Sequence, residues 1–338
     1  MNILITGGCG FLGALLARDL LARKSFSLNG AAARSINSIV LCDRAPPPAD
    51  LAANPRVHFV GGDLNELLAS GRMPAADTEL IFHLAAAVSG ECEADFDLGM
   101  RSNLAATQGL LEAARRLGTQ PVFVNTSSLA VFGKRPGFDM PDPIDDDTLP
   151  TPQSSYGSQK VMCEYLVADY GRKGFIHGRT VRPMTVSVRA GRPNGAASGF
   201  LSGMVREPLA GLRAQVPVGP EVLTALSAPA STVAGFVRAA EASTTDWGPL
   251  TGMNLPALRV SVGEMAAALE RVAGRTAISL LDWVPDEAVL RMVRSWPGNV
   301  HASRARALGL LPDDSFEQVI RQYARDNPQA VVLPLQVG

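Results

Sequence analysis

A tyrosine and a lysine four positions apart, Tyr156 and Lys160, are the residues of this sequence best suited to moving a proton. Side chains four apart share one face of a helix, so we expect the Lys160 ammonium beside the Tyr156 hydroxyl. A free phenol has a pKa of about 10, and a nearby cation favours its ionised form. Tyr156 is therefore a candidate general base that takes a proton from an alcohol. Because such pairs are common on exposed helices, the pattern needs further support.

Two serines supply that support. Ser127 and Ser128 lie just past a predicted strand at 121–125, after Thr126. In an open α/β sheet, ligands bind at the carboxyl ends of the strands. We therefore predict that Ser128 hydrogen-bonds the substrate oxygen beside Tyr156, whereas Ser127 could face a cofactor. For both serines, turn chemistry at a strand end stays open as an alternative.

Three glycines at intervals of three residues separate the first predicted strand from the first predicted helix. Gly7 permits a tight turn, Gly10 lets a pyrophosphate approach the backbone, and Gly13 lets the helix pack closely on the strand. The start of the helix offers free N–H groups and a positive dipole end to phosphates. We predict a dinucleotide-binding loop here, and a purely structural turn is the alternative. The loop comprises Gly7, Gly10, Phe11, Leu12 and Gly13.

Two acidic residues follow the second and third predicted strands. Asp43 can accept hydrogen bonds from both ribose hydroxyls of an adenosine and would repel a 2′-phosphate, which favours NAD over NADP. Two alternatives stay open: Arg44 follows directly and could bind that phosphate, or Asp43 only caps a loop. Asp63 could reach the adenine amino group, and it is equally suited to cap the next helix.

The elements around these residues alternate between short apolar strands and helices, which indicates βαβ units and a parallel sheet. We predict an α/β fold with a Rossmann-type, doubly wound parallel sheet and helices on both faces. Residues 1–183 would form the NAD-binding domain, which a segment near 223–254 rejoins. Residues 184–338 would form a smaller substrate-binding domain. Strands are predicted at 2–6, 38–42, 57–60, 80–84, 121–125 and 175–182, and helices at 11–24, 98–117, 156–170, 200–209, 262–274, 303–309 and 314–323.

The composition excludes several classes of protein. Of 338 residues, 46% are hydrophobic and 19% charged, with a net charge of -1, which argues against disorder and against nucleic-acid binding. No apolar run approaches the roughly 20 residues of a membrane span. The four cysteines lie far apart and the histidines make no metal-spaced pair, so neither a disulfide framework nor a metal site is expected. The run 145–147 is interpreted as a solvated turn. Met1 runs straight into a strand, so we expect a cytoplasmic protein without a signal peptide.

Taken together, the motifs TGGCGFLG, GGDL, HLAA, NTSSLAVFG and YGSQK resemble those of the extended short-chain dehydrogenases/reductases, also known as the NAD-dependent epimerase/dehydratase family. The resemblance covers the whole chain. It implies that Ser128, Tyr156 and Lys160 form the catalytic triad and that Asn103 supports the lysine. It also implies an NAD site that includes Leu64, Ala85, Asn103, Tyr156, Lys160, Pro183 and Thr185 besides the residues derived above.

Two departures separate this sequence from the nucleotide-sugar enzymes of that family. The dehydratases carry an Asp–Glu pair after the catalytic Ser or Thr, where this sequence has Leu129 and Ala130. The epimerases commonly carry RxxNxxG after the sixth strand, where this sequence has Thr185 and Val188 at the Asn and Gly positions. A nucleotide pocket is therefore not expected.

The next residues, RAGRPNG at 189–195, suit a small carboxylate, which arginine binds through two parallel hydrogen bonds. One or both arginines could instead be exposed loop charges. Together with the stretches 88–91 and 94–99 and SWPG at 295–298, the run RAGRPNGAAS resembles a group within the family that oxidises the C2 hydroxyl of the four-carbon acid D-erythronate with NAD. We predict that activity, a homodimer, and substrate contacts by Ser89, Arg192, Asn194 and Ser198 besides Ser128 and Tyr156. Alternatives are a nucleotide-sugar 4-epimerase and, less favoured because Tyr156 is present, a non-enzymatic NAD-sensing regulator.

Overall fold

The computed structural model describes residues 1–191 and 196–336. Its upper part is a seven-stranded sheet in the order β10-β6-β5-β4-β1-β2-β3, with every neighbouring pair parallel. The chain starts at β1, runs outward to β3, and then returns beside β1 to build the other half, which confirms the doubly wound fold. The strands are β1 (Asn2–Thr6), β2 (Ser38–Asp43), β3 (Val57–Gly61), β4 (Leu80–His83), β5 (Val122–Thr126), β6 (His177–Arg182) and β10 (Met253–Asn254).

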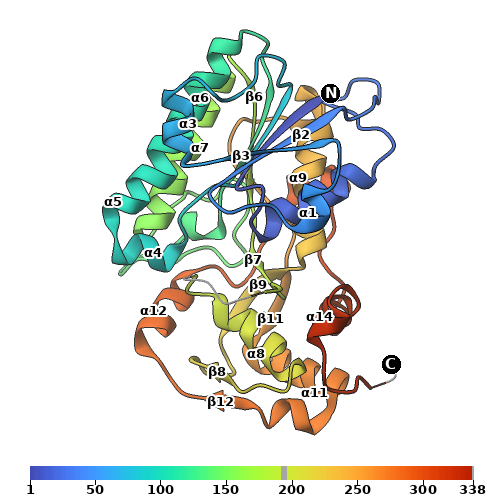
Figure 1. Ribbon diagram of the computed structural model, residues 1–338. Helices are drawn as coiled ribbons and strands as arrows, with labels where there is room; N and C mark the ends of the chain where they lie inside the picture. Colours follow the sequence, from blue (N-terminus) through green and yellow to red (C-terminus); the bar gives the residue numbers. More distant parts are fainter. Residues whose placement is uncertain (192–195, 337–338) are drawn as a thin grey trace.

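Helices cover both faces of this sheet (Figure 1). Successive strand residues point to opposite faces, so Ile3 and Ile5 pack with α1 (Phe11–Ala22) and α9 (Pro229–Glu241). Leu4, between them, packs with helices on the other face. Those helices are α3 (Leu64–Ala69), α6 (Ala106–Leu117) and α7 (Ser155–Arg172).

The helix predicted at 98–117 is divided into three contiguous pieces. It comprises α5 (Phe96–Gly99), a π-helical stretch η1 (Met100–Ala105), and α6, which ends before Gly118 at a φ of 68°. A π-helical turn rotates the residues after it relative to an α-helix, and such turns are frequent at functional sites. The helix α4 (Ser89–Ala94) was not predicted from the sequence.

The lower part of the molecule has a second hydrophobic core around a small sheet in the order β11-β9-β7. Helices α8 and α11 pack in this core, and β8 pairs with β12 beside them. Its elements are β7 (Thr185–Val186), α8 (Gly199–Leu209), β8 (Ala214–Val216), β9 (Leu223–Ser227), β11 (Leu258–Ser261), α11 (Val262–Ile278), β12 (Leu281–Trp283), α12 (Glu287–Ser295) and α14 (Phe316–Asp326).

The segment 223–254 divides between the two parts. Its first strand, β9, belongs to the small sheet, whereas α9 packs on the large sheet and β10 extends that sheet beside β6. The short helices α10 (Thr244–Trp247) and α13 (Ser303–Ala307) also contribute to the upper core through Trp247 and Ala305. The chain therefore crosses between the two parts several times.

Asp146 corrects the interpretation of residues 145–147 as a solvated turn. Its side chain is buried and accepts hydrogen bonds from the backbone N–H groups of Asn254 and Arg304, at 2.8 and 3.1 Å. These contacts join β10 to α13. Along residues 1–191 and 196–336, no helix is long and apolar enough to cross a membrane.

Candidate active site

A cavity of about 550 Å³ lies at the carboxyl ends of the large sheet, where the two parts of the molecule meet. Strand order reverses between β1 and β4, and crevices at such positions bind ligands in doubly wound folds. Most of the residues that the sequence singled out line this cavity. They are Gly7, Gly10, Phe11, Leu12, Gly13, Asp43, Asp63, Leu64, Ala85, Ser89, Ser128, Tyr156, Lys160, Pro183, Thr185 and Ser198.

The glycine loop is tightly packed at Gly7 and Gly13 and less crowded at Gly10, and all three glycines line the cavity. Gly7 has a φ of 68°, and a Cβ on Gly13 would lie 2.2 Å from the Gly7 carbonyl oxygen. A Cβ on Gly10 would instead meet its nearest neighbour at 3.3 Å. Gly10 caps α1 without a side-chain hydrogen bond, so the first N–H groups of the helix are available to an anion. The loop fits the pyrophosphate of a dinucleotide.

Both acidic residues cap loops while they line the cavity. Asp43 accepts hydrogen bonds from the N–H groups of Cys9 and Ala45, at 3.1 and 3.2 Å, and thereby ties the end of β2 to the glycine loop. Asp63 accepts the Asn65 N–H at 2.9 Å and caps α3. The capping roles are present in the structure, and the contacts with ribose and adenine stay predictions.

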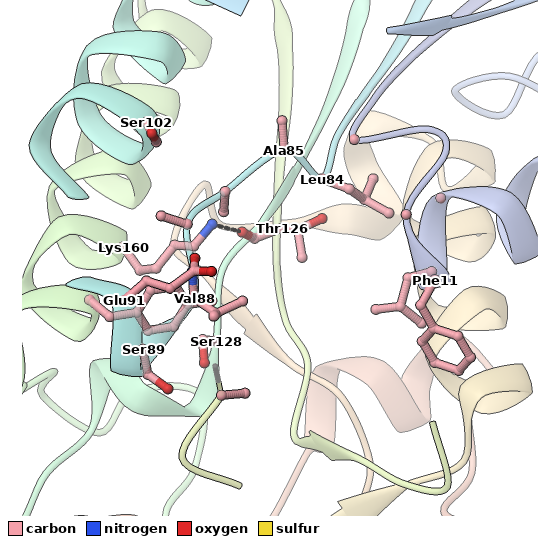
Figure 2. A pocket seen from close by; sticks show the side chains of 18 of the residues that line it. Phe11, Leu84, Ala85, Val88, Ser89, Glu91, Ser102, Thr126, Ser128 and Lys160 are labelled. Carbon is pink, nitrogen blue, oxygen red and sulfur yellow. Dashed lines mark hydrogen bonds between the residues drawn. The ribbon is translucent and has the colours of Figure 1, made fainter. Parts of the chain in front are cut away.

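Ser128, Tyr156 and Lys160 converge from two elements. Ser128 accepts the N–H of Ala130 at 3.1 Å and starts a short 3₁₀ turn after β5. The Lys160 ammonium donates to the Thr126 carbonyl at 2.8 Å (Figure 2) and lies 5.6 Å from the centre of the Tyr156 ring. This contact holds the charge of Lys160 beside the phenol, as the spacing of four residues predicts.

Gly157, the residue after Tyr156, brings these two elements together. A Cβ at this position would lie 2.1 Å from the Ala130 carbonyl oxygen. Only glycine therefore allows the first turn of α7 to pack against the turn that Ser128 caps. The sequence motif YGSQK contains this glycine, but only the fold shows that it packs against Ala130.

Asn103 does not line the cavity. It lies buried in the π-helical stretch, where its carboxamide accepts the Ala87 N–H at 2.8 Å and donates to the Gln159 side chain at 2.8 Å. Ala87 lines the cavity and Gln159 precedes Lys160 on α7. Asn103 thus joins a cavity wall to α7, and its predicted support of Lys160 is indirect.

A buried network lies behind the reacting groups and was not predicted. The Ser127 hydroxyl donates to Glu164 at 2.5 Å, and Arg182 binds the same carboxylate through two hydrogen bonds of 2.9 and 2.7 Å. All three residues are buried. The network joins β5, α7 and β6. Ser128 follows β5, Lys160 lies on α7, and Pro183 follows β6, so the network lies close to all three residues in the sequence. Glu164 follows Lys160 by four residues, which is the one signal in the sequence that it shares the same helix face.

His83 at the end of β4 is a neutral structural residue. Its two ring nitrogens lie 2.7 and 2.9 Å from the hydroxyls of Thr6 and Thr107. Complete burial lowers the pKa of His83 to about 3, and the charge of Lys160 acts in the same direction. The described residues, 1–191 and 196–336, contain no cluster of His, Cys, Asp and Glu that could hold a metal ion.

The predicted substrate contacts lie only partly within the described residues. Ser89 accepts the Ala197 N–H at 3.3 Å, and Ser198 lines the cavity nearby. Arg192 and Asn194 lie outside the described residues. Two cavity residues, Arg189 and Trp296, were not selected from the sequence as contacts. Arg189 belongs to the same arginine-bearing loop as Arg192, but no local pattern distinguishes which of the two faces the cavity.

Comparison with known proteins finds dehydrogenases and an epimerase that are similar in sequence or structure. D-erythronate dehydrogenases of Cupriavidus necator and Haemophilus influenzae are 45% and 39% identical to the chain, and each match covers 96% of this chain and 98% of the relative. The structure of a nucleoside-diphosphate-sugar epimerase from Agrobacterium tumefaciens is 37% identical, with a TM-score of 0.88 over 98% of this chain and 95% of the other. L-threonine 3-dehydrogenase from Trypanosoma brucei is 25% identical, with a TM-score of 0.83 over 98% of both chains.

The family model that matches the chain describes the NAD dependent epimerase/dehydratase family and spans residues 3–224. This range includes the glycine loop, the serines after β5 and the pair of Tyr156 and Lys160. The glycine loop, which lines the cavity at the start of α1, agrees with the dinucleotide that the family uses. The chain therefore belongs to the NAD dependent epimerase/dehydratase family, and its cofactor is NAD.

Proposed function

We propose that this protein is a dehydrogenase that oxidises the C2 hydroxyl of D-erythronate, or of a close C4 to C5 aldonate, to the 2-oxo acid with NAD. The observation that carries the proposal is one cavity that joins a dinucleotide loop to Ser128, Tyr156 and Lys160. The substrate class comes from the two D-erythronate dehydrogenases, which match the chain over nearly their full length.

Tyr156 would take the proton from the C2 hydroxyl, and Ser128 would hold the same oxygen by a hydrogen bond. Lys160, fixed by its bond to the Thr126 carbonyl, would stabilise the phenolate by its charge. NAD, when bound, supplies the acceptor for the hydride that leaves C2. Glu164 and Arg182 would hold β5 and α7 in fixed relative positions. Ser128, Tyr156 and Lys160 could then act on one substrate oxygen.

The remaining cavity residues would divide between cofactor and substrate. Gly7, Gly10, Phe11, Leu12 and Gly13 would surround the pyrophosphate. The other proposed cofactor contacts are Asp43, Asp63, Leu64, Ala85, Tyr156, Lys160, Pro183 and Thr185, with Asn103 acting from the layer behind. Ser89 and Ser198 would contact the hydroxyls of the acid.

A nucleotide-sugar epimerase is the rival function, because one solved relative bears that name. One feature of this chain counts against the related dehydratases, and a second counts against an epimerase. Leu129 and Ala130 are buried apolar residues where a dehydratase needs an acid and a base. Thr185 and Val188 are buried where an epimerase carries the asparagine and glycine of its pyrophosphate site.

A panel of acids tests the proposed function. Purified protein with NAD should form NADH with D-erythronate, and more slowly with C5 aldonates, as read from absorbance. UDP-glucose with the same protein should give neither NADH nor an epimer by chromatography. Epimerisation of a UDP-sugar without any aldonate oxidation would replace the proposal by its rival.

Three further proposals concern the whole molecule. We propose a homodimer, supported by the exposed apolar residues Phe96 on α5 and Met162 on α7, which lie on neighbouring helices; a monomer in light scattering at micromolar concentration would contradict it. Residues 184–338 would serve as the substrate-binding domain. The cytoplasmic location stays a prediction, tested by cell fractionation.

A further inference from the structure

Three basic residues line the cavity within the described part of the chain, and two of them have an assigned place. Arg44 follows Asp43 at the end of β2, where adenosine is expected. Lys160 is held by the Thr126 carbonyl beside Tyr156. The third, Arg189, has a defined position in the structure but no role in the reaction as derived above.

The backbone of Arg189 is fixed by α8. Its N–H donates to the Ser202 hydroxyl at 3.0 Å, and its carbonyl accepts a hydrogen bond from Arg206 at 2.9 Å. Ser202 and Arg206 are four residues apart and therefore share one face of the helix. Arg206 also pairs with Glu207 at 2.5 Å, so its own charge is compensated. The lower part of the molecule thus holds the main chain of Arg189 at two points.

The side chain of Arg189 reaches the upper part. Its guanidinium lies 5.5 Å from the centre of the Phe11 ring, in the first turn of α1. Figure 2 shows Phe11 on the opposite side of the cavity from Ser128 and Lys160. Arg189 therefore spans the gap between the two parts of the molecule, beside the space where a substrate must lie.

The electrostatic surroundings of Arg189 favour an anion. Burial lowers the pKa of its guanidinium and the charge of Arg206 lowers it further, whereas negative charge on Tyr156 raises it. A negative group close to both Arg189 and the reacting end of the cavity would thus be stabilised. Two anions are available there: the carboxylate of the acid, and the pyrophosphate of the dinucleotide beside α1.

We propose that Arg189 binds the substrate carboxylate and makes the enzyme specific for acids over uncharged polyols. The proposal rests on the proposed function and names a residue that function did not assign. A carboxylate on C1 is bonded directly to the C2 that loses hydride, so a cation that faces the same cavity from the Phe11 side can bind it while Ser128 holds the C2 oxygen. The planar guanidinium can form two parallel hydrogen bonds to a carboxylate. The pyrophosphate, by contrast, has the N–H groups of α1 as its partners.

The test compares D-erythronate with its uncharged primary amide, which has nearly the same shape. For wild type we expect the acid to be preferred in kcat/KM, and Arg189→Met should raise KM for the acid by about 10- to 100-fold, the loss of one charge-assisted contact. The same variant should change KM for the amide by less than about threefold, so the preference for the acid disappears. Arg189→Lys should restore part of it, because the charge returns without the two parallel bonds.

Three controls separate the possible sources of an effect. Arg213→Met removes an exposed arginine whose partner is Asp282, and should leave all constants unchanged. The Kd of NAD, from fluorescence titration without substrate, should change by less than about threefold in Arg189→Met. Arg192→Met tests the other arginine of the loop. A thermal melt shows that each variant is folded.

Binding of the acid and the amide to the NADH complex, measured by calorimetry, makes the test independent of turnover. Loss of the acid preference in Arg189→Met supports the proposal even if no aldonate is oxidised, an outcome that would refute the proposed function alone. Retained preference, a loss of preference in Arg192→Met instead, or a tenfold weaker Kd for NAD with unchanged acid binding would each overturn the assignment of Arg189.

Discussion

The two walls of the cavity are built in different ways. On the proposed cofactor wall, Gly10, Asp43 and Asp63 each lie at or just after the end of a strand of one parallel sheet, so the register of β1, β2 and β3 sets their positions. On the proposed substrate wall, Ser89 accepts a hydrogen bond from Ala197, 108 positions away in the sequence. Arg189 depends likewise on α8 for its backbone and on α1 for its side chain.

This difference indicates which part of the cavity can change its specificity most easily. Strand ends in one sheet keep their places when loops change, because backbone pairing within the sheet holds them. Contacts that join two separately packed cores shift with any change in either core. We therefore expect the cofactor wall to tolerate little change, and the substrate wall to determine which acid is oxidised.

Tyr156, the proposed general base, has the largest expected effect. Tyr156→Phe should lower kcat by about 10³-fold or more, because the proton then has no base. The Kd of NAD should stay within about threefold if the cofactor wall is independent of the reaction. Steady-state NADH formation and NAD titration measure the two. Tyr165→Phe, on the same helix but 62% exposed, is the matched control; equal turnover in both variants would exclude Tyr156 as the base.

The buried network behind the reacting groups should control stability. Glu164→Gln leaves the Arg182 charge buried without its carboxylate, and breaking a buried pair costs about 3–5 kcal/mol. Asp282→Asn breaks the exposed pair with Arg213 and should have a far smaller effect on the free energy of unfolding. Urea unfolding measures both free energies. Similar losses in the two variants would mean that burial of the Glu164–Arg182 pair is unimportant.

Two glycines of the cofactor wall should separate folding from binding. Gly13→Ala places a Cβ 2.2 Å from the Gly7 carbonyl, so we expect lower stability and NAD binding weakened by about 100-fold or more. Gly10→Ala, at a φ of -70°, places its Cβ 3.3 Å from the Gly7 carbonyl oxygen, a tight contact that a small shift can relieve, and the methyl group fills the cavity. It should weaken NAD binding about tenfold while unfolding changes by less than about 0.5 kcal/mol. Unchanged NAD binding in Gly10→Ala would remove this loop from the cofactor site.

His83 makes the stability of the sheet depend on pH. Its pKa of about 3 lies below that of a free histidine, about 6.5. Between these two pH values the unfolded chain binds a proton at His83 that the folded chain does not bind. The stability is therefore complete above pH 6.5 and falls as the pH drops toward 3, by up to about 1.4 kcal/mol per pH unit. Urea unfolding of His83→Gln across this range should show a shallower slope by about one proton. An unchanged slope would contradict a neutral, buried His83.

Cofactor preference is the smallest expected effect. Asp43 should repel a 2′-phosphate, so kcat/KM should favour NAD over NADP by at least about tenfold, or about 1.4 kcal/mol. Asp43→Asn should reduce the ratio, although its loop contacts with Cys9 and Ala45 weaken as well. Equal use of both cofactors by wild type would indicate that Arg44 offsets Asp43.

The sequence by itself determined the parts that depend on local pattern. Apolar strands, glycine spacing and the four-residue interval between Tyr156 and Lys160 predicted the doubly wound sheet and the family, because periodicity and turn chemistry act over a few residues. The same rules predicted Ser128 at a strand end. They also predicted that helix 98–117 ends at Gly118, but not that its first turns are π-helical.

Only the tertiary structure decided contacts between distant segments. Glu164 receives both Ser127 and Arg182, Gly157 packs against Ala130, and Asp146 is buried between β10 and α13. Nothing local distinguishes a buried carboxylate from an exposed one, since burial depends on which surfaces the whole chain brings together. For the same reason, the sequence could place an arginine-bearing loop after β6, but only packing against α8 and Phe11 aims Arg189 into the cavity.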